Sequence, residues 1–274
     1  MRTIPLHLAL VGWPVRHSLS PRLWEGMGAR RGIPIVYVQY PVPPDDVDAW
    51  SLLWQSELAG FNVTTPFKER AAARCAQLAP LAARIGAVNT VIRDGEEWTG
   101  HSTDGYGFTR ALLAADEPIR GRTAAVLGTG GAGRAVARAL ADAGAAVTLV
   151  TRAPERVPRG CEDLDRTGWQ DLDALGAFGI VVDATPLGHV PSIPYDRWCR
   201  GAVAIDLGYT PPVTAFLREA RAAGARTLNG LGMLVHQACL AAALMLEGDA
   251  AAAESYEEDF WAVAREVGVP VDLS

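Results

Sequence analysis

The fold of this chain is decided by residues 122–152, RTAAVLGTGGAGRAVARALADAGAAVTLVTR. Within this stretch, Arg122 to Leu127 predicts a strand, Gly131 to Ala143 an amphipathic helix, and Ala146 to Val150 a second strand. The intervening glycines let the backbone turn tightly and approach a pyrophosphate at the helix N-terminus. A glycine string alone is often only a turn, but here strand, loop, helix and strand follow in order. The stretch therefore predicts a dinucleotide-binding unit whose cofactor contacts are Gly128, Thr129, Gly130, Gly131 and Ala132.

The residues that follow the second strand indicate which dinucleotide is bound. NAD-binding units usually place an acidic residue there to accept from the ribose 2′-hydroxyl, whereas this chain has Thr151 and Arg152, with Arg156 one turn further on. A guanidinium pairs with phosphate oxygens as a fork and can stack on adenine. Solvated surface arginines are the commoner alternative. The position of these three residues nevertheless favours NADP.

The alternation of strands and helices extends on both sides of this unit and predicts an α/β fold with mostly parallel sheets. Downstream, strands are expected at 180–184 and 203–207, with a crossover helix at 213–223. Upstream, strands are expected at 6–11, 35–38, 60–64 and 87–92, and helices at 20–31, 47–58 and 68–78. The stretch 152–166 reads as a charged surface connection, and Trp50 and Trp54 are expected in a core.

We predict two domains. Residues 1–103 form a substrate-binding and catalytic domain, and residues 104–236 form a Rossmann-type NADP-binding domain. The C-terminal helices, residues 237–274, complete the first domain.

Composition excludes several classes of function. The 274 residues carry a net charge of −6, so no excess positive charge is available to attract nucleic acid or an anionic membrane. No signal segment opens the chain, and the apolar run 238–246 is shorter than the ~20 residues that span a bilayer. The four cysteines and the scattered histidines show no metal-ligand spacing. A cytoplasmic enzyme without a metal is therefore expected.

Four polar turns precede the dinucleotide unit. Ser18 and Ser20 place two hydroxyls before a helix and form a carboxylate cradle, although Ser20 also reads as the helix N-cap. The other three turns are Asn62 to Lys68, Gly86 to Thr90 and Ser102 to Gly105. Singly, each is more often a satisfied turn than a ligand site. Four of them at predicted strand ends, beside a dinucleotide unit, indicate a small-molecule site.

Taken together, these motifs closely resemble the shikimate dehydrogenase family. The resemblance covers essentially the whole chain, through HSLSP, NVTTPFK, GAVNT, TDG and GTGGAG to DLGY at 206–209 and NGLGMLVHQ at 229–237. It implies reversible NADPH-dependent reduction of 3-dehydroshikimate to shikimate, on the route to chorismate and the aromatic amino acids.

The resemblance also implies roles for individual residues. It implies that Ser18 and Ser20 bind the substrate carboxylate, and that Lys68 and Asp104 form the catalytic pair at the substrate. The implied contacts to the ring and its hydroxyls are Thr64, Asn89, Tyr209 and Gln237. The implied nicotinamide contacts are Leu207, Gly230 and Met233.

The chain departs from the family pattern at a few positions. Ser102 and Asp183 stand where asparagine is usual, Trp24 where histidine is frequent, and Ala153 where threonine follows the arginine. The last change removes a phosphate-binding hydroxyl. These departures bear on cofactor affinity and substrate preference and leave Lys68 and Asp104 in place.

Several alternatives stay open on the sequence. The nearest is a quinate/shikimate dehydrogenase that uses NAD, against which Arg152 and Arg156 count. A non-catalytic dinucleotide-binding sensor is an alternative of another class, and the intact Lys68 and Asp104 count against it. A tetrahydrofolate dehydrogenase would not need the two serines. A monomer and a homodimer are equally compatible with the sequence.

Overall fold

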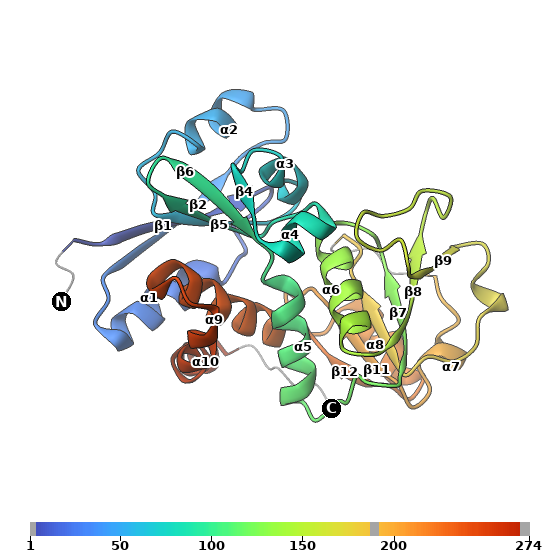
Figure 1. Cartoon of the computed structure of the whole chain (residues 1–274). Helices are drawn as coiled ribbons and strands as arrows, with labels where there is room; N and C mark the ends of the chain where they lie inside the picture. The colour runs from blue at the N-terminus through green and yellow to red at the C-terminus, as the bar shows by residue number, and fades with distance from the viewer. Residues whose placement is uncertain (1–3, 187–191, 269–274) are drawn as a thin grey trace. The chain divides into compact units, whose positions relative to one another are not determined.

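Residues 4–186 and 192–268 are described in the computed structural model, in which the chain forms two compact units (Figure 1). The first unit contains the chain up to Thr103 together with Ala238–Gly268, and the second contains Asp104–Gln237. Each unit has a six-stranded sheet with helices, which confirms the predicted α/β class.

The sheet of the first unit has the strand order β2-β1-β3-β5-β6-β4. Its strands are β1 (Leu6–Gly12), β2 (Ile35–Pro41), β3 (Gly60–Val63), β4 (Gln77–Leu78), β5 (Thr90–Asp94) and β6 (Glu97–His101). β1 pairs in parallel with β2 and β3, but β5 is antiparallel to both β3 and β6. Three of the five strand pairs are parallel, as expected of a mostly parallel sheet. β5 runs the other way because a two-residue turn links it to β6, and such a turn joins only antiparallel strands.

The helices of the first unit are partly shorter than predicted. They are α1 (Ser20–Arg31), α2 (Val47–Leu53), α3 (Lys68–Ala72) and α4 (Pro80–Ile85). The predicted helix 68–78 is wrong beyond Ala72, because the backbone of Ala76 and Ala79 donates to the carbonyls of Trp98 and Gly100 and so joins the sheet. The helix predicted over 47–58 ends at Leu53, where the chain turns so that Trp54 enters the core.

Aromatic side chains form much of the core between α2, α3 and this sheet. Trp50 stacks on Phe67 at 5.0 Å between ring centroids, and Trp54 meets Phe61 edge-on at 5.3 Å. Both tryptophans are buried, which confirms that they are core residues. Such ring pairs contribute roughly 0.5–1.5 kcal/mol each beyond the area that they bury.

The C-terminal helices are α9 (Leu231–Glu247), η2 (Ala250–Tyr256) and α10 (Glu257–Glu266). Of these helices, α10 packs on α1. Trp24 of α1 meets Phe260 of α10 edge-on at 5.7 Å, and Arg31 pairs with Asp259 at 2.7 Å. Within the described chain, no single helix is long and apolar enough to cross a membrane, although α9 and the 250–266 segment pass that test together as a pair bent by 120°.

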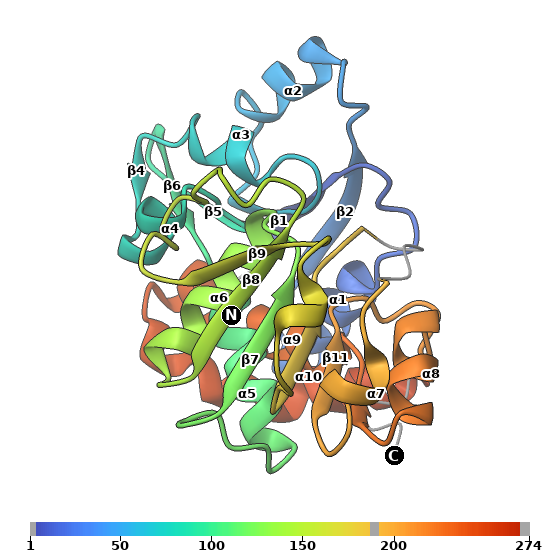
Figure 2. The ribbon, with the colours of Figure 1, turned by 90° about the vertical axis from the view of Figure 1, so that its right-hand side faces the viewer.

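The second unit has a fully parallel sheet of order β12-β11-β10-β7-β8-β9, and Figure 2 shows β7, β8 and β9 side by side. Its strands are β7 (Thr123–Leu127), β8 (Ala146–Thr151), β9 (Asp165–Gly168), β10 (Ile180–Asp183), β11 (Val203–Asp206) and β12 (Arg226–Leu228). Its helices besides the start of α9 are α5 (Asp104–Ala114), α6 (Gly131–Asp142), η1 (Leu172–Ala174), α7 (Tyr195–Trp198) and α8 (Ala215–Ala222). The predicted surface connection 152–166 is wrong at its end, because Asp165 and Arg166 pair with β8.

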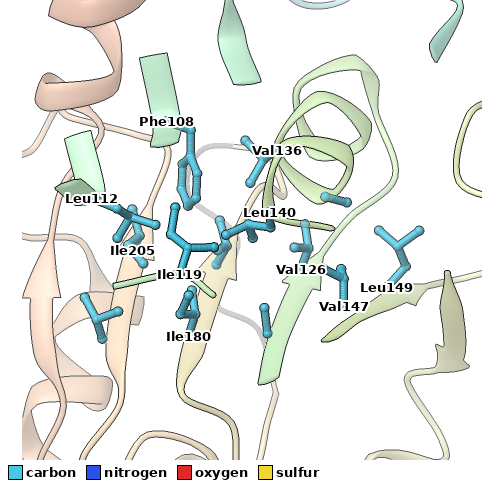
Figure 3. Packing of buried hydrophobic residues seen from close by; sticks show 14 of the residues in the cluster. Phe108, Leu112, Ile119, Val126, Val136, Leu140, Val147, Leu149, Ile180 and Ile205 are labelled. Carbon is cyan, nitrogen blue, oxygen red and sulfur yellow. The ribbon is translucent and has the colours of Figure 1, made fainter. Parts of the chain in front are cut away.

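One apolar core cluster of the second unit lies where α5 and α6 cover the sheet. Phe108 and Leu112 of α5 and Val136 and Leu140 of α6 cluster with buried residues of the strands, among them Val126 (Figure 3). This apolar face accounts for the 3.6-residue period that predicted α6. The packing fixes α6 against the strand that feeds the glycine loop.

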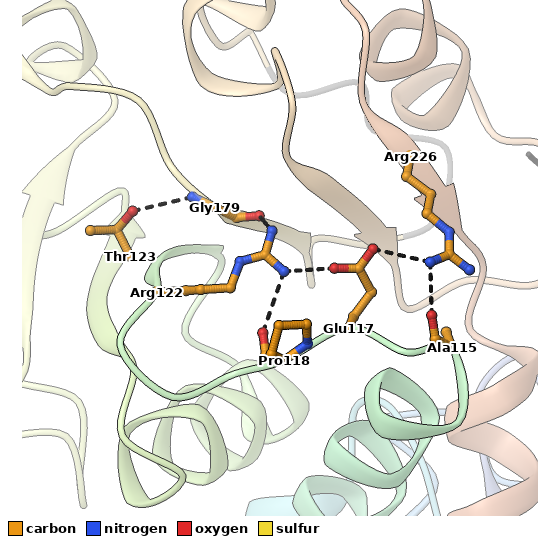
Figure 4. Close-up of polar contacts among 7 residues, drawn as sticks. All are labelled: Ala115, Glu117, Pro118, Arg122, Thr123, Gly179 and Arg226. Carbon is orange, nitrogen blue, oxygen red and sulfur yellow. Dashed lines mark hydrogen bonds and ion pairs between the residues drawn. The ribbon is translucent and has the colours of Figure 1, made fainter.

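Charged residues lie at the amino-terminal ends of β7, β10 and β12. Glu117 accepts from Arg122 at 2.6 Å and from Arg226 at 3.2 Å (Figure 4). Arg122 also donates to the Gly179 carbonyl, and Arg226 donates to the Ala115 carbonyl at 2.7 Å. These contacts occupy the amino-terminal ends of the strands. Ligands of doubly wound sheets bind at the other end, beyond the carboxyl ends of the strands.

Candidate active site

In the first unit, the predicted polar turns meet at one end of the strands of the sheet. The parallel strands β1 and β3 end there, β5 begins there because it is antiparallel to β3, and β6 ends opposite its first residue. The register that places Asn62 beside Thr90, and Thr90 beside His101, brings the predicted turns together. The sheet topology therefore gathers side chains that lie far apart in the sequence.

Ser18 and Ser20 stand together at the start of α1. The Ser18 hydroxyl donates to the Ser20 hydroxyl at 3.1 Å, and the Ser20 backbone N–H donates to the Ser18 hydroxyl at 3.2 Å. The prediction that Ser20 is the N-cap is wrong, because Leu19 holds that position and Ser20 is already helical. Ser18 instead satisfies a free amide of the helix start. Two hydroxyls beside a twelve-residue helix N-terminus can bind a carboxylate.

Asn89 is held by Thr103. The Asn89 amide donates to the Thr103 hydroxyl at 2.8 Å, and the Thr103 backbone N–H donates to the Asn89 side-chain oxygen at 2.7 Å. Both residues are buried. This reciprocal pair fixes the backbone that enters α5, so Asn89 is a structural clamp as well as a predicted ring contact.

Behind Asn89 lies a buried chain of hydrogen bonds that sequence reasoning missed. The Tyr37 hydroxyl donates to the Asn62 side-chain oxygen at 2.8 Å, and the Asn62 amide donates to the Thr90 hydroxyl at 3.0 Å and the Asn89 carbonyl at 3.2 Å. Trp24 stacks on the Tyr37 ring at 5.5 Å. The tryptophan found where the family often has histidine thus supports this network from behind. Only the asparagine at the start of NVTTPFK could have signalled it.

Thr64 and Lys68 follow the end of β3. The Thr64 backbone N–H donates to the Val11 carbonyl at 2.8 Å, and the Lys68 carbonyl accepts from the Val88 N–H at 3.0 Å. Both side chains are partly exposed. Nearby, burial lowers the pKa of His101, so its imidazole is favoured as the neutral form.

In the second unit, the glycine loop has the geometry that a pyrophosphate requires. Gly128 has φ +100°, a conformation that residues with side chains rarely adopt, and this sets the tight turn. A side chain at Gly133 would meet the Gly128 carbonyl oxygen at 2.2 Å, so glycine is needed for the helix to pack on the strand. At Gly130, which caps α6, the space around the backbone is open. Together with the N-terminus of α6, which begins at Gly131, these features fit a dinucleotide.

The end of β8 carries the residues predicted to contact the 2′-phosphate of NADP. The Thr129 and Thr151 hydroxyls lie 3.4 Å apart, and the Ala153 backbone N–H donates to Thr151 at 3.3 Å. Arg152 and Arg156 are both exposed. Two cations at the position where NAD-binding units place an acid fit a 2′-phosphate.

The loop after β11 carries Leu207 and Tyr209 and is braced by Asp206, which sequence reasoning missed. The Asp206 carboxylate accepts from the Gly208 N–H at 2.7 Å and from the Thr214 hydroxyl at 2.6 Å. Burial raises the pKa of Asp206, although these two hydrogen bonds act to lower it. The Gly230 N–H donates to the Gly208 carbonyl at 2.9 Å and fixes the same loop.

The remaining predicted residues of this unit lie on α5 and α9. Asp104 is the buried first residue of α5. Met233 belongs to the apolar core, and the Gln237 amide donates to the Leu234 carbonyl at 2.9 Å. Of the predicted catalytic pair, Lys68 therefore belongs to the first unit and Asp104 to the second. Within residues 4–186 and 192–268, no three His, Cys, Asp or Glu side chains gather as metal ligands.

Comparison with known proteins gives consistent matches. A family model described as the shikimate dehydrogenase substrate binding domain matches residues 10–91. The chain is 40% identical over 248 residues to shikimate dehydrogenase (NADP(+)) of Xylella fastidiosa strain M12, over 84% of this chain and 87% of that protein. The shikimate dehydrogenase (NADP(+)) of Acidiphilium cryptum strain JF-5 is 41% identical over 237 residues, covering 84% and 86%. Shikimate 5-dehydrogenase from Thermus thermophilus, solved in complex with NADP(H) and shikimate, has a TM-score of 0.78 at 34% identity and covers 93% of this chain and 99% of that one.

Proposed function

This chain belongs to the shikimate dehydrogenase family, and on that premise we propose that it catalyses the reversible NADPH-dependent reduction of 3-dehydroshikimate to shikimate. The observation that carries the proposal is the similarity, over nearly the whole chain, to a Thermus thermophilus enzyme solved with both NADP(H) and shikimate. The paired serines of the first unit and the glycine loop of the second supply a carboxylate site and a pyrophosphate site. The product would enter the synthesis of chorismate and the aromatic amino acids.

Substrate binding is assigned to the polar edge of the first unit and to two residues of the second. Ser18 and Ser20 hold the carboxylate, where the helix N-terminus adds favourable partial charge. The ring and its hydroxyls are contacted by Thr64, Asn89, Tyr209 and Gln237. The nicotinamide side is lined by Leu207, Gly230 and Met233.

The chemistry assigned to Lys68 is proton transfer. When bound, NADPH supplies the hydride that adds to the ring carbonyl carbon. Negative charge develops on the carbonyl oxygen, so Lys68 donates a proton to that oxygen and takes it back in the reverse reaction. Asp104 acts with Lys68 as a coupled acid–base pair.

Lys68 is the single lysine of the chain, and the other 24 of its 25 basic residues are arginine. An arginine cannot lose its proton in a protein, whereas an amine can. The only lysine of the chain therefore stands at the position to which we assign the transferable proton.

A spectrophotometric assay tests the activity and the cofactor together. We expect shikimate to drive the reduction of NADP, followed by nicotinamide absorbance, with kcat/KM at least about tenfold higher for NADP than for NAD. Equal or better use of NAD would favour the quinate/shikimate dehydrogenase alternative. Turnover with neither cofactor would favour the dinucleotide-binding sensor.

The two serines give a separate prediction. We expect Ser18→Ala and Ser20→Ala each to raise KM for shikimate about tenfold and to change kcat less than about threefold. Each variant removes one hydrogen bond to the substrate carboxylate, which takes no part in the reaction. Ser51→Ala, on α2, serves as the matched control. Unchanged KM in both serine variants would place the carboxylate elsewhere.

We further propose that the partners are small molecules alone, that the protein acts in the cytoplasm, and that it is a monomer or a homodimer. The net charge of −6 gives it no means of releasing counterions from nucleic acid or an anionic membrane. Sedimentation velocity distinguishes the two oligomeric states.

A further inference from the structure

The connection from β8 to β9 carries both arginines assigned to the 2′-phosphate. Residues 152–164 contain no helix or strand, and Arg152 and Arg156 are exposed on it. Connections of this length without secondary structure are uncommon in compact domains unless they have a function. Exposed arginines on a loose loop would lose much conformational freedom on binding a phosphate, so a fixed loop binds more tightly.

Arg138 fixes the far half of this loop to α6. Its side chain is only 5% exposed, and it donates to both carboxylate oxygens of Asp163, at 2.7 and 2.9 Å. It also pairs with Asp142 at 2.9 Å. Burial acts to lower the pKa of Arg138, but the hydrogen bond to Asp163 and the charges of both aspartates raise it overall. Both hydrogen bonds to Asp163 come from the Nη1 atom of Arg138, and hydrogen bonds between charged groups are stronger than those between neutral groups.

Arg166 joins the two halves of the loop. This second residue of β9 donates to the Pro154 carbonyl at 3.4 Å and to the Leu164 carbonyl at 3.3 Å. Cys161 and Leu164 anchor the far half in the apolar core beside α6. The near half, which carries Arg152 and Arg156, is therefore tied through Arg166 to a half that is fixed by Arg138 and by the core.

We propose that Arg138 and Arg166 are positioning residues for cofactor choice, holding loop 152–164 so that Arg152 and Arg156 meet the 2′-phosphate of NADP. The proposal rests on the proposed function, because it requires NADP as the cofactor. Ala153 supplies no hydroxyl to the 2′-phosphate. The preference of this chain for NADP over NAD therefore depends more heavily on the positions of Arg152 and Arg156.

Calorimetric titration with 2′,5′-ADP and with 5′-AMP tests this directly, since the two ligands differ only in the 2′-phosphate. Asp163→Ala is the first variant, because Asp163 is 59% exposed and Arg138 keeps Asp142 as a partner. Arg166→Met is the second, independent variant. We expect each to weaken 2′,5′-ADP binding about tenfold and 5′-AMP binding less than twofold. Arg200→Met, an exposed arginine outside the loop, is the control.

A double-mutant cycle separates positioning from general stabilisation. If the loop acts through Arg152 and Arg156, then adding Asp163→Ala to a variant that already carries Arg152→Met and Arg156→Met weakens 2′,5′-ADP binding no further. Fully additive losses, or equal losses for both ligands, would overturn the proposal while leaving the enzyme assignment intact. A wild-type protein that binds both ligands equally would overturn the choice of NADP and this proposal with it.

Discussion

Replacing Lys68 by arginine is expected to lower kcat about a thousandfold, nearly as much as replacing it by alanine, while KM for shikimate changes about threefold or less. The reason is chemical rather than electrostatic. Arginine keeps the positive charge beside the developing oxyanion but cannot give up its proton at neutral pH. A role in charge stabilisation alone would leave the arginine variant far more active than the alanine variant.

The chain offers a matched control for this experiment. Arg74→Lys makes the opposite exchange at an exposed position just beyond α3, and it should leave kcat and KM unchanged. If Lys68→Arg retained near-normal kcat, the assignment of proton transfer to Lys68 would be wrong. Thermal denaturation of each variant establishes that the comparison is made between folded proteins.

A single lysine also makes the amine directly observable. Reductive methylation with ¹³C-formaldehyde labels only Lys68 and the chain's terminal amine, and the latter titrates near ~8. The pH titration of the remaining methyl signal then reports the pKa of Lys68 without any enzyme assay. We expect this signal to shift on addition of shikimate, because the substrate changes the surroundings of the amine.

The centre of the second unit, with β7, α6, β8, β10, β11 and α8, could be predicted because its signals are local, whereas α5, α7, β9 and β12 are not predicted from the sequence. The apolar residues of α6 recur with the period of a helix. β7 and β8 are parallel strands buried on both faces, and such strands appear in a sequence as short apolar runs. In the first unit, β4, α4 and β6 are not predicted from the sequence. β4 is only two residues long and exists because it pairs with β6, a contact across more than twenty residues that no local period encodes.

The candidate site shows the same division. The motifs located the paired serines and the glycine loop, because helix starts and tight turns have their own residue preferences. The bond from Tyr37 to Asn62 and the clamp between Asn89 and Thr103 depend on which strands become neighbours. The residues assigned to substrate and cofactor could thus be named from motifs, whereas the residues that hold them in place required the fold.

Gly230 provides the second large effect, because its lack of a side chain is a packing requirement. A Cβ atom at this position would lie 2.0 Å from the Leu207 carbonyl oxygen and 2.5 Å from its carbon. Both are backbone atoms of the first residue after β11, so no flexible side chain can move aside. The adjacent hydrogen bond from the Gly230 N–H to the Gly208 carbonyl, at 2.9 Å, ties the two segments together and prevents an easy separation.

We therefore expect Gly230→Ala to lower the free energy of unfolding by about 3 kcal/mol, measured by urea denaturation, because the loop after β11 must shift or the contact must remain compressed. Gly176→Ala is the matched control in the same unit, since Gly176 has open space and no positive φ, and it should change stability by less than about 0.5 kcal/mol. If Gly230→Ala were as stable as the control, the loop would have to shift at little cost, and the hydrogen bonds that Gly208 and Thr214 donate to Asp206 could not be holding it. A stable variant with poor turnover would show that the substitution disturbs the positions of Leu207 and Tyr209 rather than the stability of the fold. A variant that is both unstable and inactive would show that these positions depend on an intact sheet.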